Sequence, residues 1–199
     1  MKDFVIKMLK GRLPPNYSYH NCQHTLYVTE KAMEIARAEG CTEAEIRLIQ
    51  AAALWHDTGF IYQYPNHEEK SCQLVRQRLP DYGFSAEEIR TICGMIMATK
   101  TPQCPRNKLE EVIADADLEY LGTENAEKMA GELFKELRSI NPLLDINDWR
   151  LTEISFLRNH HYFTRYCRAE KESGKQAYLE RLEKKKIIPD QLGSGTDPE

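Results

Sequence analysis

The sequence predicts an all-α protein, and three observations support this. Apolar residues recur at the spacing of an amphipathic helix through nearly all of the 199 residues. No five-residue stretch alternates cleanly between polar and apolar side chains beside hairpin turn residues, as a half-buried strand would. Capping motifs, glycines and prolines lie at the boundaries of the periodic segments. We therefore expect a single-domain helical bundle.

The first two expected helices flank a glycine. One covers residues 22–39 and ends at Gly40, where a left-handed cap has no steric penalty. The next begins at TEAE, residues 42–45, in which the threonine and the second glutamate can cap each other's free amides. It continues to Trp55 and is apolar on most sides, so we expect it at the centre of the bundle.

Five further helical segments are expected after this central helix. Ser85 and Glu88 form a second capping box, and Pro80 and Gly122 mark helix ends. The last segment is expected as one long or broken helix. The five segments cover residues 67–79, 85–100, 107–122, 124–139 and 149–185.

No repeat and no biased linker divides the chain, so one domain is expected over residues 1–199. Its core is expected at about 17–122, with the C-terminal helices at 124–185 packed against it. Residues 1–16 and 186–199 are expected at the periphery. The small polar residues of 190–199 predict a disordered tail.

The composition limits the function classes. Hydrophobic residues make up 41% of the chain, charged residues 29%, and the net charge is −4, as in an ordinary globular protein. The chain has no run of about 18 apolar residues that could cross a bilayer, so no membrane role is expected. The N-terminus lacks a secretory signal, which predicts a cytoplasmic protein. The sequence has no long stripe of basic residues that could contact the phosphate backbone of a nucleic acid, so no nucleic-acid partner is expected.

Four side chains form a candidate metal site. His56 and Asp57 are adjacent at the end of the central helix, about 100 degrees apart around its axis, so both could reach one ion. His24 lies on the apolar side of its helix, where an unpaired imidazole is unfavourable. Asp117 lies near the apolar side of another helix. A buried hydrogen bond explains any one of these residues, but a metal ion explains all four together.

The segments YHNCQHT, LWHDTGF and ADADLEYLG carry the order H…HD…D. This order resembles the HD superfamily of metal-dependent phosphohydrolases, whose fold is a bundle of α-helices. The resemblance covers roughly residues 17–122. It implies that His24 is the first metal ligand, His56 and Asp57 the central pair, and Asp117 the last.

The sequence leaves open the identity of the metal and which aspartate is its last ligand. Two imidazoles and two carboxylates suit Mn²⁺, Fe²⁺, Mg²⁺, Zn²⁺ or Co²⁺, so the ligand types do not identify the one divalent ion expected. Asp115 competes with Asp117 because two residues on a helix point about 200 degrees apart and only one should reach the ion. The resemblance favours Asp117, with Asp115 in an outer position.

Further residues are assigned catalytic roles. Asp57 could accept a proton from a metal-activated water, and His20 could donate one to the departing alkoxide. His67 could contact the substrate phosphate or a second metal, and Lys100 could also contact the phosphate. His160 and His161 could close the pocket from the C-terminal helix, although one of them is expected to pack or face solvent. No histidine lies between His67 and Asp115, which favours one metal.

The expected activity is hydrolysis of a phosphomonoester or phosphodiester of a small molecule, with a nucleotide favoured. The alternative is a nucleotide- or metabolite-binding module of the same family with little turnover. A third reading, oxygenase chemistry, would need two irons. The sequence leaves the substrate and the oligomeric state undetermined.

Overall fold

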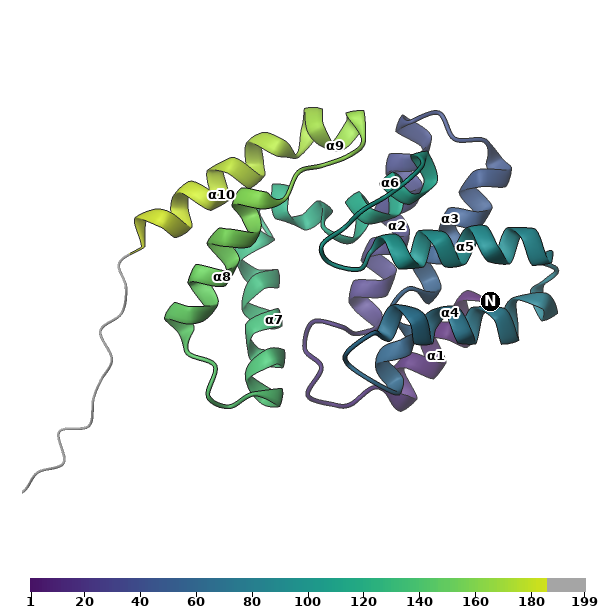
Figure 1. Ribbon diagram of the computed structural model, residues 1–199, viewed down its shortest axis with the longest axis horizontal. Helices are drawn as coiled ribbons and strands as arrows, with labels where there is room; N and C mark the ends of the chain where they lie inside the picture. Colours follow the sequence, from purple (N-terminus) through teal and green to yellow (C-terminus); the bar gives the residue numbers. More distant parts are fainter. Residues whose placement is uncertain (186–199) are drawn as a thin grey trace, which may run out of the picture.

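The computed structural model describes residues 1–185. Within that range the chain forms α-helices and three short 3-10 helices, and no strand, which confirms the all-α prediction (Figure 1). The elements are α1 Lys2–Arg12, α2 Cys22–Ala38, α3 Glu43–Trp55, η1 Thr58–Ile61, α4 His67–Arg78, η2 Leu79–Tyr82, α5 Ala86–Ala98, α6 Lys108–Asp117, η3 Glu119–Gly122, α7 Ala126–Ile140, α8 Ile146–Asn159, α9 Arg165–Glu170 and α10 Glu172–Lys184.

Side-chain caps fix where the site-bearing helices begin. The Asn21 side chain accepts hydrogen bonds from the first free amides of α2, including that of His24. Both predicted capping boxes are present, at Thr42 for α3 and at Ser85 for α5. Asn107 caps α6 in the same way. Four elements that reach the site therefore start where the sequence predicts.

One segment differs from the prediction, and in another the structure shows which of two expected forms is present. The expected helix 107–122 ends earlier, because α6 stops at Asp117 and the chain tightens into η3. The expected segment 149–185 is broken into the end of α8, then α9 and α10. The first break follows His160, whose backbone is extended, and Thr164 caps the next helix.

The buried apolar residues form two clusters. The larger one lies among α1 to α6 and includes Trp55 and Ile92, both fully buried. The smaller one gathers side chains from η3, α7, α8 and α10, including Leu121 and Leu157. Figure 1 shows the corresponding two groups of helices, with α7, α8 and α10 beside the N-terminal bundle. The single-domain assignment stays a prediction.

The expectation that residues 1–16 are peripheral is wrong for α1. Val5 and Leu9 are buried and belong to the larger cluster, because they lie four residues apart on one face of this helix. Residues 186–199, including the tail predicted as disordered, lie outside the described residues. None of the helices in residues 1–185 combines the length and apolarity needed to cross a membrane.

Candidate metal centre

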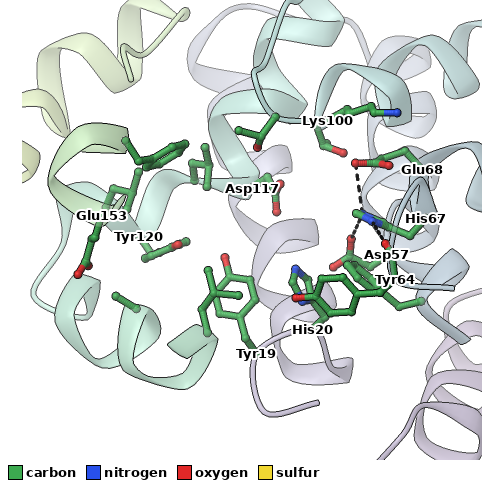
Figure 2. Close-up of a pocket in the computed structure, with 18 of the residues that line it drawn as sticks. Tyr19, His20, Asp57, Tyr64, His67, Glu68, Lys100, Asp117, Tyr120 and Glu153 are labelled. Atoms are coloured by element: carbon green, nitrogen blue, oxygen red, sulfur yellow. Dashed lines mark hydrogen bonds and ion pairs between the residues drawn. The ribbon is translucent and has the colours of Figure 1, made fainter. Parts of the chain in front are cut away.

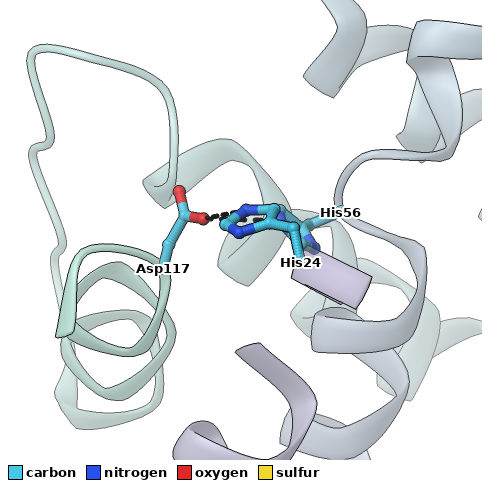
Figure 3. Close-up of side chains that lie close together, drawn as sticks. All are labelled: His24, His56 and Asp117. Atoms are coloured by element: carbon cyan, nitrogen blue, oxygen red, sulfur yellow. Dashed lines mark hydrogen bonds and ion pairs between the residues drawn. The ribbon is translucent and has the colours of Figure 1, made fainter. Parts of the chain in front are cut away.

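Three helix ends bring His24, His56 and Asp117 together (Figure 3). His24 lies in the first turn of α2, His56 follows the last residue of α3, and Asp117 is the last residue of α6. One candidate ligand atom from each of the three residues lies within 4.8 Å of the other two. Both histidines are buried. The three side chains are therefore gathered from segments far apart in the sequence.

Asp57 completes this cluster. Its Oδ2 lies 3.1 Å from His56 Nε2 and 3.5 Å from His24 Nε2. Asp117 Oδ1 lies 3.0 Å from His24 Nε2 and 3.5 Å from His56 Nε2. Neighbouring ligands on a metal with bonds of about 2.1 Å stand about 3.0 to 3.4 Å apart. The distances from each carboxylate to the two imidazoles are therefore close to those between ligands of one divalent ion.

Hydrogen bonding within the protein leaves two of the metal-facing atoms available. His56 Nδ1 lies 2.8 Å from the carbonyl oxygen of Ala53, so this nitrogen donates to the backbone and fixes the ring. An outer hydrogen bond of this kind orients metal-binding histidines. Within residues 1–185, the buried atoms His56 Nε2 and Asp57 Oδ2 have no hydrogen-bond partner. Two unsatisfied buried atoms that face each other are what a bound cation would satisfy.

The pKa shifts of the candidate ligands indicate that negative charge is concentrated at this centre. Burial alone would lower the pKa of His56, but the carboxylates of Asp57 and Asp117 outweigh it and raise this pKa well above the usual value. Burial opposes ionisation of Asp57, yet the neighbouring His56 holds its pKa well below the usual range. The neighbouring His24 and His56 imidazoles outweigh burial at Asp117 and likewise lower its pKa. Both carboxylates are therefore ionised and favour a cation beside them.

The start of α4 places His67 at the edge of the centre. His67 Nε2 lies 3.4 Å from Asp57 Oδ1 and 3.6 Å from a carboxylate oxygen of Glu68. Burial alone would lower the pKa of His67, but the Asp57 carboxylate raises it.

Gly59 makes the approach of η1 to α4 possible, because a Cβ there would lie 1.9 Å from the His67 carbonyl oxygen. Ser71 accepts a hydrogen bond from the Gly59 amide and donates one to the His56 carbonyl oxygen.

His20 precedes α2 and is held from α7. Its Nδ1 pairs with the buried carboxylate of Glu136. Its ring stacks on Phe60 with centroids 4.0 Å apart, and His67 stacks on the same phenyl ring at 3.7 Å. The two histidines assigned to catalysis therefore flank one phenyl ring beside Asp57.

A cavity of about 440 Å³ opens from this centre (Figure 2). His20, Asp57, His67 and Asp117 line its metal end. Residues of η3, α7 and α8 line the opposite end, so the cavity lies between the two groups of helices. It is large enough for a small organic phosphate.

Lys100 lines the cavity but is already paired. Its ammonium lies 2.6 Å from a Glu69 carboxylate oxygen and 2.9 Å from the Asn66 side-chain oxygen. The Glu69 carboxylate raises the pKa of Lys100. This lysine therefore contributes less net charge to the cavity than the sequence suggests.

Asp115 does not join the metal centre. Its carboxylate accepts hydrogen bonds from the backbone amides of Phe163 and Thr164 and from the Thr164 hydroxyl, at 2.6–3.2 Å. Burial raises its pKa, and these donors oppose the rise. Asp115 is therefore a structural anchor for the segment between α8 and α9, and Asp117 is the aspartate that faces the histidines.

His160 and His161 do not line the main cavity. They line a separate smaller cavity with Pro102 and Phe163, and the His161 side chain is exposed. His160 Nδ1 lies 3.5 Å from the Lys175 ammonium. The suggestion that these histidines close the active-site pocket is therefore wrong. The segment that carries them is anchored at Asp115 instead.

Sequence reasoning missed three groups at this cavity. Glu68 is buried beside His67, and one of its oxygens has no hydrogen-bond partner within residues 1–185. Its position next to His67 was the available signal. Tyr19 and Tyr120 contact each other across the middle of the cavity. Glu136 gave no local signal, because it is an acidic residue of an amphipathic helix far from His20 in the sequence.

Comparisons with known proteins identify the family. Residues 22–119 match the family model of the HD domain. No curated protein matches the chain. The crystal structure of a "predicted HD superfamily hydrolase" from an uncultured Thermotogales bacterium is similar to it, with a TM-score of 0.59 and 18% sequence identity over 91% of this chain and 88% of that one. At this identity the likeness shows the fold. The chain is therefore a member of the HD superfamily, a family of metal-dependent hydrolases, with its HD domain at residues 22–119.

Proposed function

We propose that the protein is a phosphohydrolase that hydrolyses a phosphomonoester or phosphodiester bond of a small molecule, with a nucleotide favoured. One observation carries the proposal. Two imidazoles and a carboxylate gather from three helix ends, with the Asp57 carboxylate 3.1 Å from His56. Both aspartates and two further histidines line a cavity of about 440 Å³. Neutral nitrogen and charged oxygen donors suit a divalent ion that activates water.

His24, His56, Asp57 and Asp117 are the residues that would hold the ion. A divalent ion bound there supplies a water of lowered pKa and a positive charge for the phosphate oxygens. Asp57 is ionised, and its Oδ1 points toward His67 rather than the other histidines. In our proposal this oxygen accepts the proton of the attacking water.

His20 is proposed as the acid that protonates the leaving oxygen. Its Nδ1 is engaged by Glu136, so Nε2 is the ring nitrogen that remains to donate a proton. His67 also stacks on Phe60 and is proposed to hold the phosphate. Lys100 is proposed as a second phosphate contact, made when its ammonium leaves Glu69.

The test measures phosphate release and metal content together. The purified protein is screened with nucleotides and sugar phosphates in Mn²⁺, Mg²⁺, Fe²⁺, Co²⁺ and Zn²⁺ in turn. We expect orthophosphate release from a monoester, or an alcohol and a monoester from a diester, with at least one metal. We expect Asp57→Ala to lose both turnover and bound metal. The matched control is Asp81→Ala, which removes an exposed carboxylate in η2. Saturable nucleotide binding without release from any ester would instead support a binding module.

A further inference from the structure

The cavity continues beyond the metal centre into a second, apolar part. We call this part the distal chamber and define it by its apolar lining residues Leu121, Leu133, Trp149, Phe156 and Leu157. They belong to η3, α7 and α8 and lie after the matched HD domain, which ends at residue 119. The chamber is therefore built by helices that the HD family model does not cover.

The chamber has apolar surface that the protein itself does not cover. Leu133, Trp149 and Phe156 line the cavity and are only half-buried. Apolar surface left open inside a cavity is stabilised when an apolar group of a ligand covers it. The position of these three side chains thus indicates a ligand with an apolar portion.

Two tyrosines separate the chamber from the metal end. The hydroxyls of Tyr19 and Tyr120 point toward each other between the two ends in Figure 2, and the rings lie 5.9 Å apart. Glu153 also lines the cavity, but its carboxylate accepts a hydrogen bond from the Tyr178 hydroxyl and points away from the metal end. The chamber therefore presents mainly hydrocarbon and aromatic surface to a ligand that extends past the tyrosines.

The charges at the metal end favour a single phosphate group. Lys100 is the one Lys or Arg among the described residues that line the cavity, and Glu69 pairs with it. Three carboxylates, from Asp57, Glu68 and Asp117, line the same end. A triphosphate would bring several further negative charges toward these carboxylates with little cationic compensation.

We propose that the substrate is a phosphate monoester of an alcohol with a large apolar or aromatic group, with the phosphate at the metal centre and that group in the distal chamber. This inference rests on the proposed phosphohydrolase function and specifies its substrate class. Di- and triphosphates and small polyol phosphates are disfavoured. The apolar group contributes binding free energy that the metal end cannot supply.

The first experiment measures kcat/KM for n-alkyl phosphates from ethyl to hexyl, which share one leaving-group chemistry. We expect kcat/KM to rise about threefold with each added methylene until the chamber is filled. Hexyl diphosphate, tested as a competitor of hexyl phosphate, is expected to bind more weakly than hexyl phosphate itself. A flat series, or tighter binding of the diphosphate, would overturn the inference.

Variants localise the effect. Leu133→Ala and Trp149→Leu each remove part of the chamber wall, and we expect at least a fivefold loss of kcat/KM for hexyl phosphate with ethyl phosphate unchanged. The control is Leu151→Ala, because Leu151 lies on α8 but is 59% exposed and does not line the cavity. Ethyl phosphate turnover shows that each variant is folded. Equal losses for both esters, or a loss in the control, would contradict the chamber assignment.

A second readout separates this inference from the proposed function. If no ester is hydrolysed with any metal, the proposed function fails. Titration calorimetry with ethyl- and hexylphosphonate, which carry a stable carbon–phosphorus bond, still tests the chamber directly. We expect hexylphosphonate to bind at least tenfold more tightly than ethylphosphonate in the wild type and not in Leu133→Ala. Equal affinities of the two phosphonates for the wild type would overturn the inference.

Discussion

Glu136 of α7 holds His20 through both of its carboxylate oxygens. Oε1 pairs with His20 Nδ1. Oε2 accepts hydrogen bonds from the backbone amides of Tyr19 and His20, each with an N–O distance of 2.9 Å. Tyr64 donates a further hydrogen bond to Oε1 at 3.1 Å. Burial opposes ionisation of Glu136, but His20 and these amides outweigh it and lower its pKa. A helix outside the matched HD domain thus fixes the orientation of the proposed acid.

The first prediction concerns the substitution Glu136→Gln. The amide keeps the shape but removes the carboxylate charge beside His20 Nδ1, so the ring is held less firmly in one orientation. We expect kcat to fall about 10- to 100-fold, a part of what a general acid contributes. KM and the metal content are expected to stay close to the wild type. Steady-state kinetics and elemental analysis measure these quantities.

Glu132→Gln is the matched control for this prediction. Glu132 lies one turn earlier on α7 and pairs with Lys135 at the surface. The substitution Glu132→Gln should leave kcat unchanged. A Glu136→Gln enzyme with normal kcat would show that the carboxylate serves folding alone.

The second prediction separates the two aspartates of α6. Asp115→Ala removes the acceptor of two buried amides and one hydroxyl, so we expect the free energy of unfolding to fall by about 3 kcal/mol. The folded fraction should still bind the metal. Asp117→Ala should lose the metal instead, because Asp117 Oδ1 lies 3.0 Å from His24 Nε2.

Urea unfolding and elemental analysis of both variants test this assignment. The two substitutions are each other's controls, because they remove the same group two residues apart on one helix. Loss of bound metal in Asp115→Ala, with Asp117→Ala retaining it, would reverse the roles proposed for the two aspartates.

The sequence predicts well those features that depend on neighbouring residues. The capping motifs of α3 and α5 and the end of α2 before Gly40 are all local patterns, and the structure has them where expected. The four candidate ligands could also be selected from the sequence, because His24 and Asp117 interrupt apolar helix faces and His56 and Asp57 end a buried helix. Their gathering at one point agrees with that selection, and their roles stay a prediction.

Contacts between distant segments were not predictable in this way. The contact of Glu136 with His20 joins residues 116 positions apart, and nothing near either residue announces it. The break after His160 has a similar origin, because Asp115 captures the amides of Phe163 and Thr164. The Asp115 carboxylate, an acceptor from another helix, then competes with continuation of α8. The helix propensities of the residues after His160 give no sign of this competition.

The third prediction is a pH dependence of stability caused by His160. Burial and the Lys175 ammonium lower the pKa of His160 to about 4, against about 6.5 in an unfolded chain. Between these values the unfolded chain binds a proton that the folded protein does not. The contribution of His160 to stability is therefore lost as the pH falls from about 6.5 to about 4.

The substitution His160→Gln removes this titration. We expect the difference in unfolding free energy between wild type and variant to change by up to about 1.4 kcal/mol per pH unit within this window. Urea unfolding at several pH values between 4.5 and 7.5 measures it. The control is His161→Gln, which changes the exposed neighbour. Parallel curves for wild type and His160→Gln would show that His160 titrates normally in the folded protein.

The fourth prediction concerns the contact of α10 with η3. A Cβ at Gly174 would lie 2.1 Å from the carbonyl oxygen of Gly122, so an alanine there must push backbone away from backbone. We expect Gly174→Ala to lower the free energy of unfolding by about 2 kcal/mol or more. Because η3 begins two residues after Asp117, the displacement should also weaken metal binding.

Gly131→Ala is the control, because a Cβ at Gly131 meets nothing within 4 Å in the middle of α7. Replacing a helical glycine by alanine in open space should raise stability by about 0.5 to 1 kcal/mol. The two alanine variants should therefore shift the urea midpoint in opposite directions. Shifts of the same sign would mean that α10 and η3 do not approach closely enough for Gly174 to be required, and that η3 is positioned by its other contacts with α7.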